Sequence, residues 1–348
     1  MTRVALLTPF AAPSVGGNAV TVGRIARGLR QRGLDVRVWD LSATPPATIE
    51  AQIEGYRPAL LHAFHARRAG PLALDLASRL GVPLVVTLTG TDANHDLVDA
   101  HRAATVRRIL DGASLLTAFH ESIVEQVVRI APALRLRLLV VPQSVQMDGA
   151  EPFDLPARWP LPADRVLFVF AAGIRAVKAP RRPLASLDAL AVSDPRLRLL
   201  YAGPILDPGE GEALKRALAP RPWAHHVGSV PPAQMASLLA QADVVLNCSV
   251  SEGGMANSVL EALALERAVL VSDVPGNRGL VQDEVTGLTF ADDAELATKA
   301  ERLVRDAALR ARLGRAGRAL VERQYPIARE LDGYIGAYRR VSVAVPSA

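Results

Sequence analysis

Two cations and a glutamate stand where the pattern of the chain predicts the ligand-binding edge of a sheet. Arg175 and Lys178 follow the apolar run 166–170. Glu252 follows another apolar run, 244–248, and open α/β sheets bind ligands at the carboxyl ends of their strands. Cations at that edge suit a pyrophosphate, because they would stabilise the charge of the leaving group. The competing interpretation is a pair of solvated surface cations.

A glycine pair and the start of a predicted helix follow Glu252. Gly253 and Gly254 expose backbone amides, and the helix near Ser258 would direct its N-terminus toward a phosphate. Glu261, one turn into that helix, could bind ribose hydroxyls. Ser258 and Glu261 also have the spacing of a helix capping box, in which Glu261 would only start the helix. The spacing leaves both interpretations open.

The first half of the chain carries weaker signals. Gly16 and Gly17 precede a predicted helix, and a glycine pair lets the backbone approach an anion closely. They lack the third glycine of a dinucleotide-binding motif, so a plain strand-to-helix turn is an equal alternative. His65 and Arg67 follow the apolar run 60–62 and could line a binding site, although a lone histidine is more often structural.

Short apolar runs alternate with helical patterns along the chain, which predicts parallel sheets built from strand–helix–strand units. The expected strands are 4–8, 36–39, 60–62, 84–88, 115–118 and 138–141, then 166–170, 197–201, 226–227, 244–246 and 268–271. Prolines interrupt the pattern over 146–164, which is typical of a linker. We therefore expect an α/β fold of two facing Rossmann-like domains, residues 1–155 and 160–326, with a binding cleft between them.

The composition argues against other classes of function. The 348 residues include 40 Lys and Arg against 35 Asp and Glu, a formal charge of +5, and only 4% are aromatic. Nucleic-acid binding is not expected, because the arginines are spread along helical stretches rather than clustered with aromatic residues. The basic stretch from Arg24 to Arg37 allows a weak contact with an anionic membrane surface, although a solvated helix face explains it more simply.

The sequence also bears on location and on metals. No apolar run reaches the roughly 18 residues of a membrane-spanning helix, and the N-terminus lacks the pattern of a secretion signal. Cys248 is the single cysteine, which suits a reducing compartment, so we expect a cytoplasmic protein. His225 and His226 have no partner at metal-ligand spacing, and we expect neither a metal nor a cofactor.

Beyond these patterns, the chain resembles the family-4 retaining glycosyltransferases of the GT-B fold. The likeness rests on Glu-Gly in a loop followed by Glu-Ala on a helix, and it extends to Gly16-Gly17, Arg175 with Lys178, 202–204, 226–228 and 285–288. Within that family it looks like the glycosyltransferase 1 domain-containing group, through 90–92, 119–122, 143–144, 173–178 and 274–277. It is also similar to the selenosugar synthases of selenoneine biosynthesis, through 65–69, 88–92, 252–254 and 276–279.

The resemblance implies a hexosyltransferase with a nucleotide-sugar donor, expected to be a UDP-sugar, and an acceptor that it does not identify. The implied catalytic residues are Glu252, Arg175, Lys178 and Asp92. The implied donor-binding residues are Gly16, Gly17, Gly203, Val227, Gly253, Gly254, Asn257, Ser258, Val259 and Glu261. The implied acceptor-side residues are His65, Arg67, Thr89, Thr91 and His120. Such transferases need neither a metal nor an enzymic nucleophile, since the departing phosphate helps to deprotonate the acceptor.

Three departures from the family pattern bear on these roles. Glu252 and Glu261 are nine positions apart instead of eight. Gly173 stands where the family has an arginine, and the loop histidine of the family is missing from 88–92. Two alternatives therefore stay open, a selenosugar synthase that joins a UDP-sugar to selenophosphate and a nucleotide-sugar binding protein without catalysis. The resemblance further implies that a helix over 327–343 crosses back to the first domain.

Overall fold

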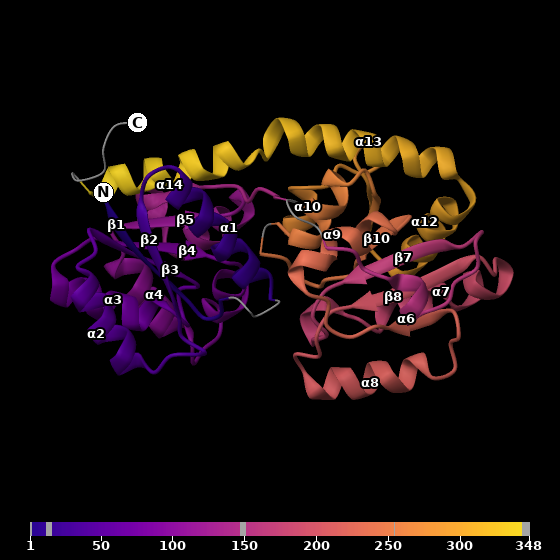
Figure 1. Cartoon of the computed structure of the whole chain (residues 1–348), viewed down its shortest axis with the longest axis horizontal. Helices are drawn as coiled ribbons and strands as arrows, with labels where there is room; N and C mark the ends of the chain where they lie inside the picture. The colour runs from indigo at the N-terminus through magenta and orange to yellow at the C-terminus, as the bar shows by residue number, and fades with distance from the viewer. Residues whose placement is uncertain (1, 12–15, 147–150, 254, 343–348) are drawn as a thin grey trace. The chain divides into compact units, whose positions relative to one another are not determined.

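The chain forms two compact units in the computed structural model, which describes residues 2–11, 16–146, 151–253 and 255–342 (Figure 1). The first unit comprises Met1–Ser144, Gly253–Met255 and Tyr325–Ala348. The second unit comprises Val145–Glu252 and Ala256–Gln324. Within the described residues, each unit contains one sheet of six parallel strands.

The sheet of the first unit has the strand order β2-β1-β3-β4-β5-β6. Its strands are β1 (Arg3–Thr8), β2 (Asp35–Asp40), β3 (Leu60–Phe64), β4 (Leu84–Leu88), β5 (Leu115–Ala118) and β6 (Leu138–Val140). The helices between them are α1 (Gly17–Gln31), α2 (Pro46–Tyr56), α3 (Gly70–Leu80), α4 (Ala103–Gly112) and α5 (Glu121–Ile130). Strands β3, β4 and β5 are buried along their whole length, because helices cover a parallel sheet on both faces. The strand order reverses between β1 and β3, which is the switch point of this sheet.

Helix α14 (Ile327–Val341) completes one face of the first unit, where it packs beside α1 (Figure 1). Tyr334 and Tyr338 of α14 are fully buried in the core that also holds Ile25 and Leu29 of α1. A helix from the far end of the sequence therefore supplies part of the core of the first unit.

Polar contacts inside this core hold α14 in place. Arg24 donates two hydrogen bonds, of 2.9 and 2.8 Å, to the carboxylate of Glu330, and Ser144 Oγ donates to the same carboxylate at 2.6 Å. His62 Nδ1 lies 2.8 Å from the hydroxyl of Tyr338. Burial lowers the pKa of His62 to about 3, so the ring is neutral and contributes a hydrogen bond rather than a charge.

The sheet of the second unit has the strand order β12-β11-β10-β7-β8-β9. Its strands are β7 (Val166–Ala171), β8 (Leu197–Ala202), β9 (Ala224–His226), β10 (Val244–Asn247), β11 (Ala268–Ser272) and β12 (Leu288–Phe290). Its helices are α6 (Leu155–Arg158), α7 (Arg182–Ser193), α8 (Pro208–Leu218), α9 (Pro232–Ala240), α10 (Asn257–Ala264), α11 (Pro275–Arg278), α12 (Asp293–Arg305) and α13 (Ala307–Gln324). The order reverses between β7 and β10, which is the switch point of the second sheet.

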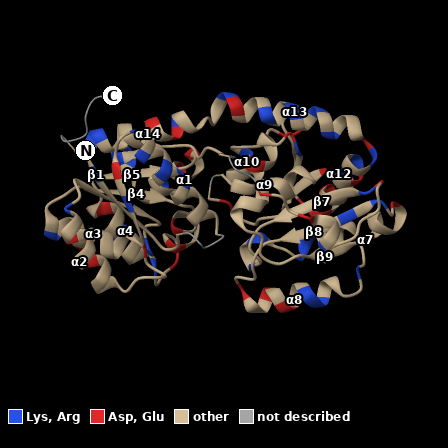
Figure 2. Ribbon diagram, in the orientation of Figure 1, with Lys and Arg blue, Asp and Glu red and all other residues tan. Residues whose placement is uncertain are grey.

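The structure confirms the predicted α/β architecture of parallel sheets and departs from the sequence pattern in details. Strand β12 and the short helix α6 were not predicted. The described part of the expected linker packs on the second unit, where Phe153 is buried and Glu151 N–H donates to Ala233 O at 2.8 Å. Acidic and basic residues are mixed along the helices of both units (Figure 2). Among the described helices, none combines the length and apolarity needed to cross a membrane.

Candidate functional site

The switch point of the second sheet brings together two segments that carry predicted site residues. Arg175 and Lys178 follow β7, and Glu252 follows β10. These two strands pair with each other, so the segments leave the sheet side by side at its carboxyl edge. The topology thus unites Lys178 and Glu252, which are 74 positions apart in the sequence.

Lys178 and Glu252 form a close ion pair at this edge. The Lys178 ammonium donates to Glu252 Oε1, and the two side chains are 15% and 7% exposed. The same oxygen accepts hydrogen bonds from Asn247 Nδ2 at 2.9 Å and from Ser249 Oγ at 2.6 Å. Burial acts to raise the pKa of Glu252, but the charge of Lys178 and the three hydrogen bonds outweigh it and hold that pKa below its usual value. Glu252 is therefore an ionised carboxylate in a poorly hydrated position.

Two of these partners were not predicted. Asn247 ends the apolar strand β10, and Ser249 follows two positions later. Their signal in the sequence is a polar residue at the carboxyl end of an otherwise apolar run, which is where side chains of a parallel sheet meet a ligand.

The turn that carries the two cations is short and regular. Arg175 immediately precedes a single 3-10 turn, Ala176–Lys178, and its carbonyl accepts from Lys178 N–H at 3.0 Å. The Arg175 side chain is exposed, whereas Lys178 is directed to Glu252. The structure thus separates the two cations, one held in the ion pair and one at the surface.

Gly203 allows the backbone at the carboxyl edge to pack closely. A Cβ added at Gly203 would lie 2.1 Å from Ala172 O. Gly203 N–H donates to Gly228 O at 2.8 Å, and His226 Nε2 lies 2.8 Å from Gly203 O. Val227 N–H donates to a carbonyl of β8 at 3.0 Å and continues the pairing beyond β9. No side chain fits at position 203, and the backbone around Val227 is held rigidly.

Helix α10 begins at Asn257, and its N-cap residue, Ala256, makes no side-chain capping hydrogen bond. Ser258 and Glu261 therefore lie inside the helix, and the capping-box interpretation of Glu261 is wrong. Val259 is fully buried, so only its backbone could face a ligand. Glu261 is half-buried on the second turn of the helix.

The two glycines after Glu252 are not placed with these residues by the structure. Gly253 is grouped with the first unit. Gly254 lies outside the described residues. The expectation that their amides meet a donor sugar stays a prediction.

In the first unit, the loop after β1 leads to a glycine at the start of α1. Gly16 is the N-cap residue, in extended conformation, and its carbonyl accepts from Ala19 N–H at 2.9 Å. Gly17 is the first residue of the helix. The two glycines therefore stand at a helix N-terminus near a switch point, where an anion is favoured.

His65, after β3, is held in a strained conformation. Its φ is +80°, a region that costs free energy for any residue other than glycine. Its Nδ1 and Nε2 lie 3.8 Å from Asp92 Oδ2 and 4.0 Å from Asp96 Oδ2. Burial lowers the pKa of His65 more than the two carboxylates raise it, so a neutral ring sits between two acids.

Asp92 is enclosed by backbone amides rather than directed outward. It is 0% exposed, and its carboxylate accepts from the N–H groups of Ala66 at 2.8 Å, Gly90 at 2.9 Å and Thr89 at 3.0 Å. Asp92 therefore shapes the loop that carries Thr89 and the exposed Thr91. This contact pattern assigns it the positioning of a loop.

A single π-helical turn, Asp92–Asp96, follows this loop. Its last residue, Asp96, is buried and accepts from Arg67 Nε at 2.9 Å and from Arg102 at 3.1 Å. Such turns are rare and are frequent at functional sites. Arg67 is therefore already paired on the predicted acceptor side. His120 follows β5, which pairs with β4, and its Nδ1 accepts from Ser122 N–H at 3.0 Å and caps α5.

The described residues include no group of three or more His, Cys, Asp or Glu side chains placed to hold a metal ion.

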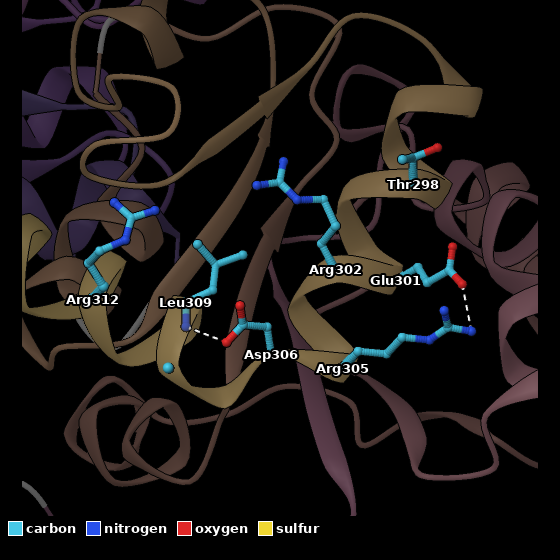
Figure 3. Close-up of a pocket in the computed structure, with 8 residues that line it drawn as sticks. Thr298, Glu301, Arg302, Arg305, Asp306, Leu309 and Arg312 are labelled. Carbon is cyan, nitrogen blue, oxygen red and sulfur yellow. Dashed lines mark hydrogen bonds and ion pairs between the residues drawn. The ribbon is translucent and has the colours of Figure 1, made fainter.

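A surface groove of about 620 Å³ lies where α12 meets α13, lined by Arg302, Arg305 and Arg312 among others (Figure 3). Arg305 pairs with Glu301 at 2.7 Å, and Arg302 pairs with Glu284 at 2.6 Å. Carboxylates therefore neutralise Arg302 and Arg305, and Arg312 donates to the Glu284 carbonyl at 2.9 Å, so we do not assign a ligand to the groove.

Most of the second unit matches a known protein family. Residues 165–306 match the family model of the group 1 glycosyl transferases. This match spans Arg175, Lys178, Glu252 and Glu261. Glycosyltransferase 1 domain-containing protein 1 of Xenopus tropicalis is 24% identical over 326 residues, which cover 91% of this chain and 92% of that protein. The D-inositol 3-phosphate glycosyltransferase of Streptomyces avermitilis is 28% identical over 294 residues, which cover 75% of this chain and 62% of that protein.

Solved structures identify the fold. Sucrose-phosphate synthase of Thermosynechococcus elongatus superposes with a TM-score of 0.82 at 19% identity, over 98% of this chain and 99% of that one. The Anabaena protein HepE in complex with UDP and glucose superposes with a TM-score of 0.79 at 15% identity, over 98% of this chain and 100% of that one. The chain has a GT-B fold. Together with the family match, these similarities support a glycosyltransferase.

Proposed function

We propose that this chain is a metal-independent retaining glycosyltransferase that moves a hexose from a UDP-sugar to an acceptor. The observation that carries the proposal is the Lys178–Glu252 pair at the switch point of the second sheet, inside the segment that matches a glycosyltransferase family model. A cation beside an ionised carboxylate at this edge can meet a diphosphate and a sugar hydroxyl at the same time.

In the proposed reaction, the bond between the anomeric carbon and the phosphate oxygen breaks and a bond to the acceptor oxygen forms on the same face. The acceptor proton passes to the departing phosphate oxygen. Lys178 and Arg175 stabilise the charge that develops on the diphosphate. Glu252, held ionised by its three hydrogen-bond donors, accepts from a sugar hydroxyl and orients the ring. Glu261, on α10, binds the ribose.

The choice of UDP rests on similar structures. Anabaena HepE has been solved with UDP and with UDP-glucose. Backbone groups near Val227 would bind the base, because this stretch is held rigidly at the carboxyl edge.

Donor binding tests the proposal directly. The protein should melt at a higher temperature in UDP or a UDP-sugar, and less so in GDP or ADP, because a ligand that binds only the folded state stabilises it. Lys178→Ala should abolish this shift and the transfer of sugar. Lys215→Ala, an exposed lysine on α8 of the same unit, is the matched control and should change neither. A chain that binds no nucleoside diphosphate does not have the proposed function.

The acceptor decides between the proposal and its alternatives. With selenophosphate as acceptor, a selenosugar synthase would release a selenosugar that mass spectrometry detects under reducing conditions. With alcohol acceptors, a glycosyltransferase would yield a glycoside. A protein that binds the donor but produces neither product, and does not hydrolyse the donor, would be a binding protein only.

A further inference from the structure

The segment 276–279 was singled out by sequence similarity, and the structure shows what its asparagine does. Asn277 belongs to the short helix α11 after β11 and is 1% exposed. Its Nδ2 donates to Ser272 O at 2.9 Å and lies 3.4 Å from Asn247 Oδ1. Since β10 and β11 are paired neighbours, the amide of Asn277 connects the carboxyl ends of two strands.

Both residues that Asn277 contacts, Asn247 and Ser272, are connected to Glu252 by hydrogen bonds. Asn247 Oδ1 accepts from Ser249 N–H at 3.0 Å, which leaves Asn247 Nδ2 to donate to Glu252. Ser272 Oγ donates to Ser249 O at 2.5 Å, and Ser249 Oγ donates to Glu252. Of the two neutral donors on the Glu252 carboxylate, Asn247 thus contacts Asn277 directly, and Ser249 is held by Ser272, which contacts Asn277.

The second atom of the Asn277 amide indicates why an asparagine stands here. Its Oδ1 is buried and has no hydrogen-bond partner among the described residues. A buried polar atom without a partner costs folding free energy, and a smaller apolar residue would avoid that cost. The donating side of the amide must therefore compensate for it, and that side faces Ser272 and Asn247.

We propose that Asn277 is a positioning residue for the Lys178–Glu252 pair, acting through Asn247, Ser249 and Ser272. It touches neither charge itself. It holds the end of β10 so that Glu252 meets Lys178 in one geometry, and the pair is thereby preorganised before a donor arrives. This inference rests on the proposed function of the same site.

A double-mutant cycle tests it. Asn277→Ala should lower kcat by about tenfold in the wild-type background, the size expected for loss of hydrogen bonds that fix a reacting group. In the Glu252→Gln background the same change should cost less than about twofold, because Asn277 acts through the Glu252 carboxylate. A residue that only supports the fold would cost the same in both backgrounds, and equal costs would overturn the inference.

Two further variants keep the test decisive. Arg278→Ala removes the neighbouring side chain of α11, which is exposed and pairs with Asp273, and it should leave kcat unchanged. If Asn277→Ala does not fold, Asn277→Ser removes the donating amide without adding a charge and should show the same coupling to Glu252. If the wild type transfers sugar but Asn277 and Glu252 show no coupling, this inference alone is wrong. If the wild type turns over no nucleotide sugar, the proposed function is wrong as well.

Discussion

Lys178 and Glu252 meet because β7 and β10 are neighbours at the point where the order of the second sheet reverses. Between β7 and β10 the chain forms β8 and β9, which lie on the other side of β7 in the sheet. An ammonium and a carboxylate are thereby held together at a sheet edge with little water around them. Removal of the charge of Lys178 or of Glu252 leaves the other charge partly buried and unpaired. The pair is therefore sensitive to substitution and to pH.

Glu252→Gln keeps the shape of the side chain and removes its charge. We expect kcat for sugar transfer to fall by about 100-fold, in the range found when a preorganised polar group at a reacting centre is lost. Binding of UDP should persist, because Lys178 remains available to the phosphates. Steady-state kinetics and calorimetry separate the two effects. Glu301→Gln, in the exposed pair with Arg305, is the control and should keep the wild-type rate.

The same pair predicts how stability depends on pH. The pKa of Glu252 is lower in the folded protein than its ordinary value of 4.5, so the stabilisation is complete above that value and disappears as the pH falls through the folded pKa. The free energy of unfolding of the wild type should exceed that of Glu252→Gln by a constant amount near neutral pH. This difference should shrink below about pH 4.5. A difference that grows on acidification would contradict the geometry of the pair.

Gly203→Ala should destabilise the second unit. The added Cβ would lie 2.1 Å from Ala172 O, and relief of that overlap requires a backbone shift that costs about 1–3 kcal/mol. Chemical denaturation measures the change. Gly23→Ala on α1, where an added Cβ meets no atom within 4 Å, should instead stabilise the chain by up to about 1 kcal/mol, because alanine favours a helix.

The contacts of α14 give a paired prediction on stability. Glu330→Ala leaves Arg24 buried without its carboxylate, and we expect a loss of about 3–5 kcal/mol in the free energy of unfolding. Asp332→Ala removes the partner of Arg32, the C-cap residue of α1, but that pair is exposed and should cost less than about 1 kcal/mol. Similar costs for both variants would show that α14 is not anchored through Glu330.

The sequence predicted the parallel sheets because buried parallel strands are continuous apolar runs. It also placed Lys178 and Glu252 at strand ends. It could not predict that they touch, since their contact depends on the order of strands in the sheet. The hydrogen bonds of Asn247 and Ser249 to Glu252 were missed for the same reason.

Asp92 illustrates a different limit. Its position after β4 is typical of a residue that faces a substrate. Only the structure shows that the amides of Ala66, Thr89 and Gly90 surround its carboxylate. The capping-box pattern at Ser258 and Glu261 failed because the N-cap residue of α10 is Ala256, two residues before Ser258. A short polar motif is compatible with several local roles. The residues packed around it in the fold determine which role it has.

Helix α14 also has a consequence for the order in which the protein is made. The first 144 residues leave the ribosome early, and N-terminal domains generally fold during synthesis. Here the core of the first unit includes Tyr334 and Tyr338, which are synthesised after the whole second unit. The core of the first unit therefore cannot be complete until α14 has been synthesised, after the whole second unit.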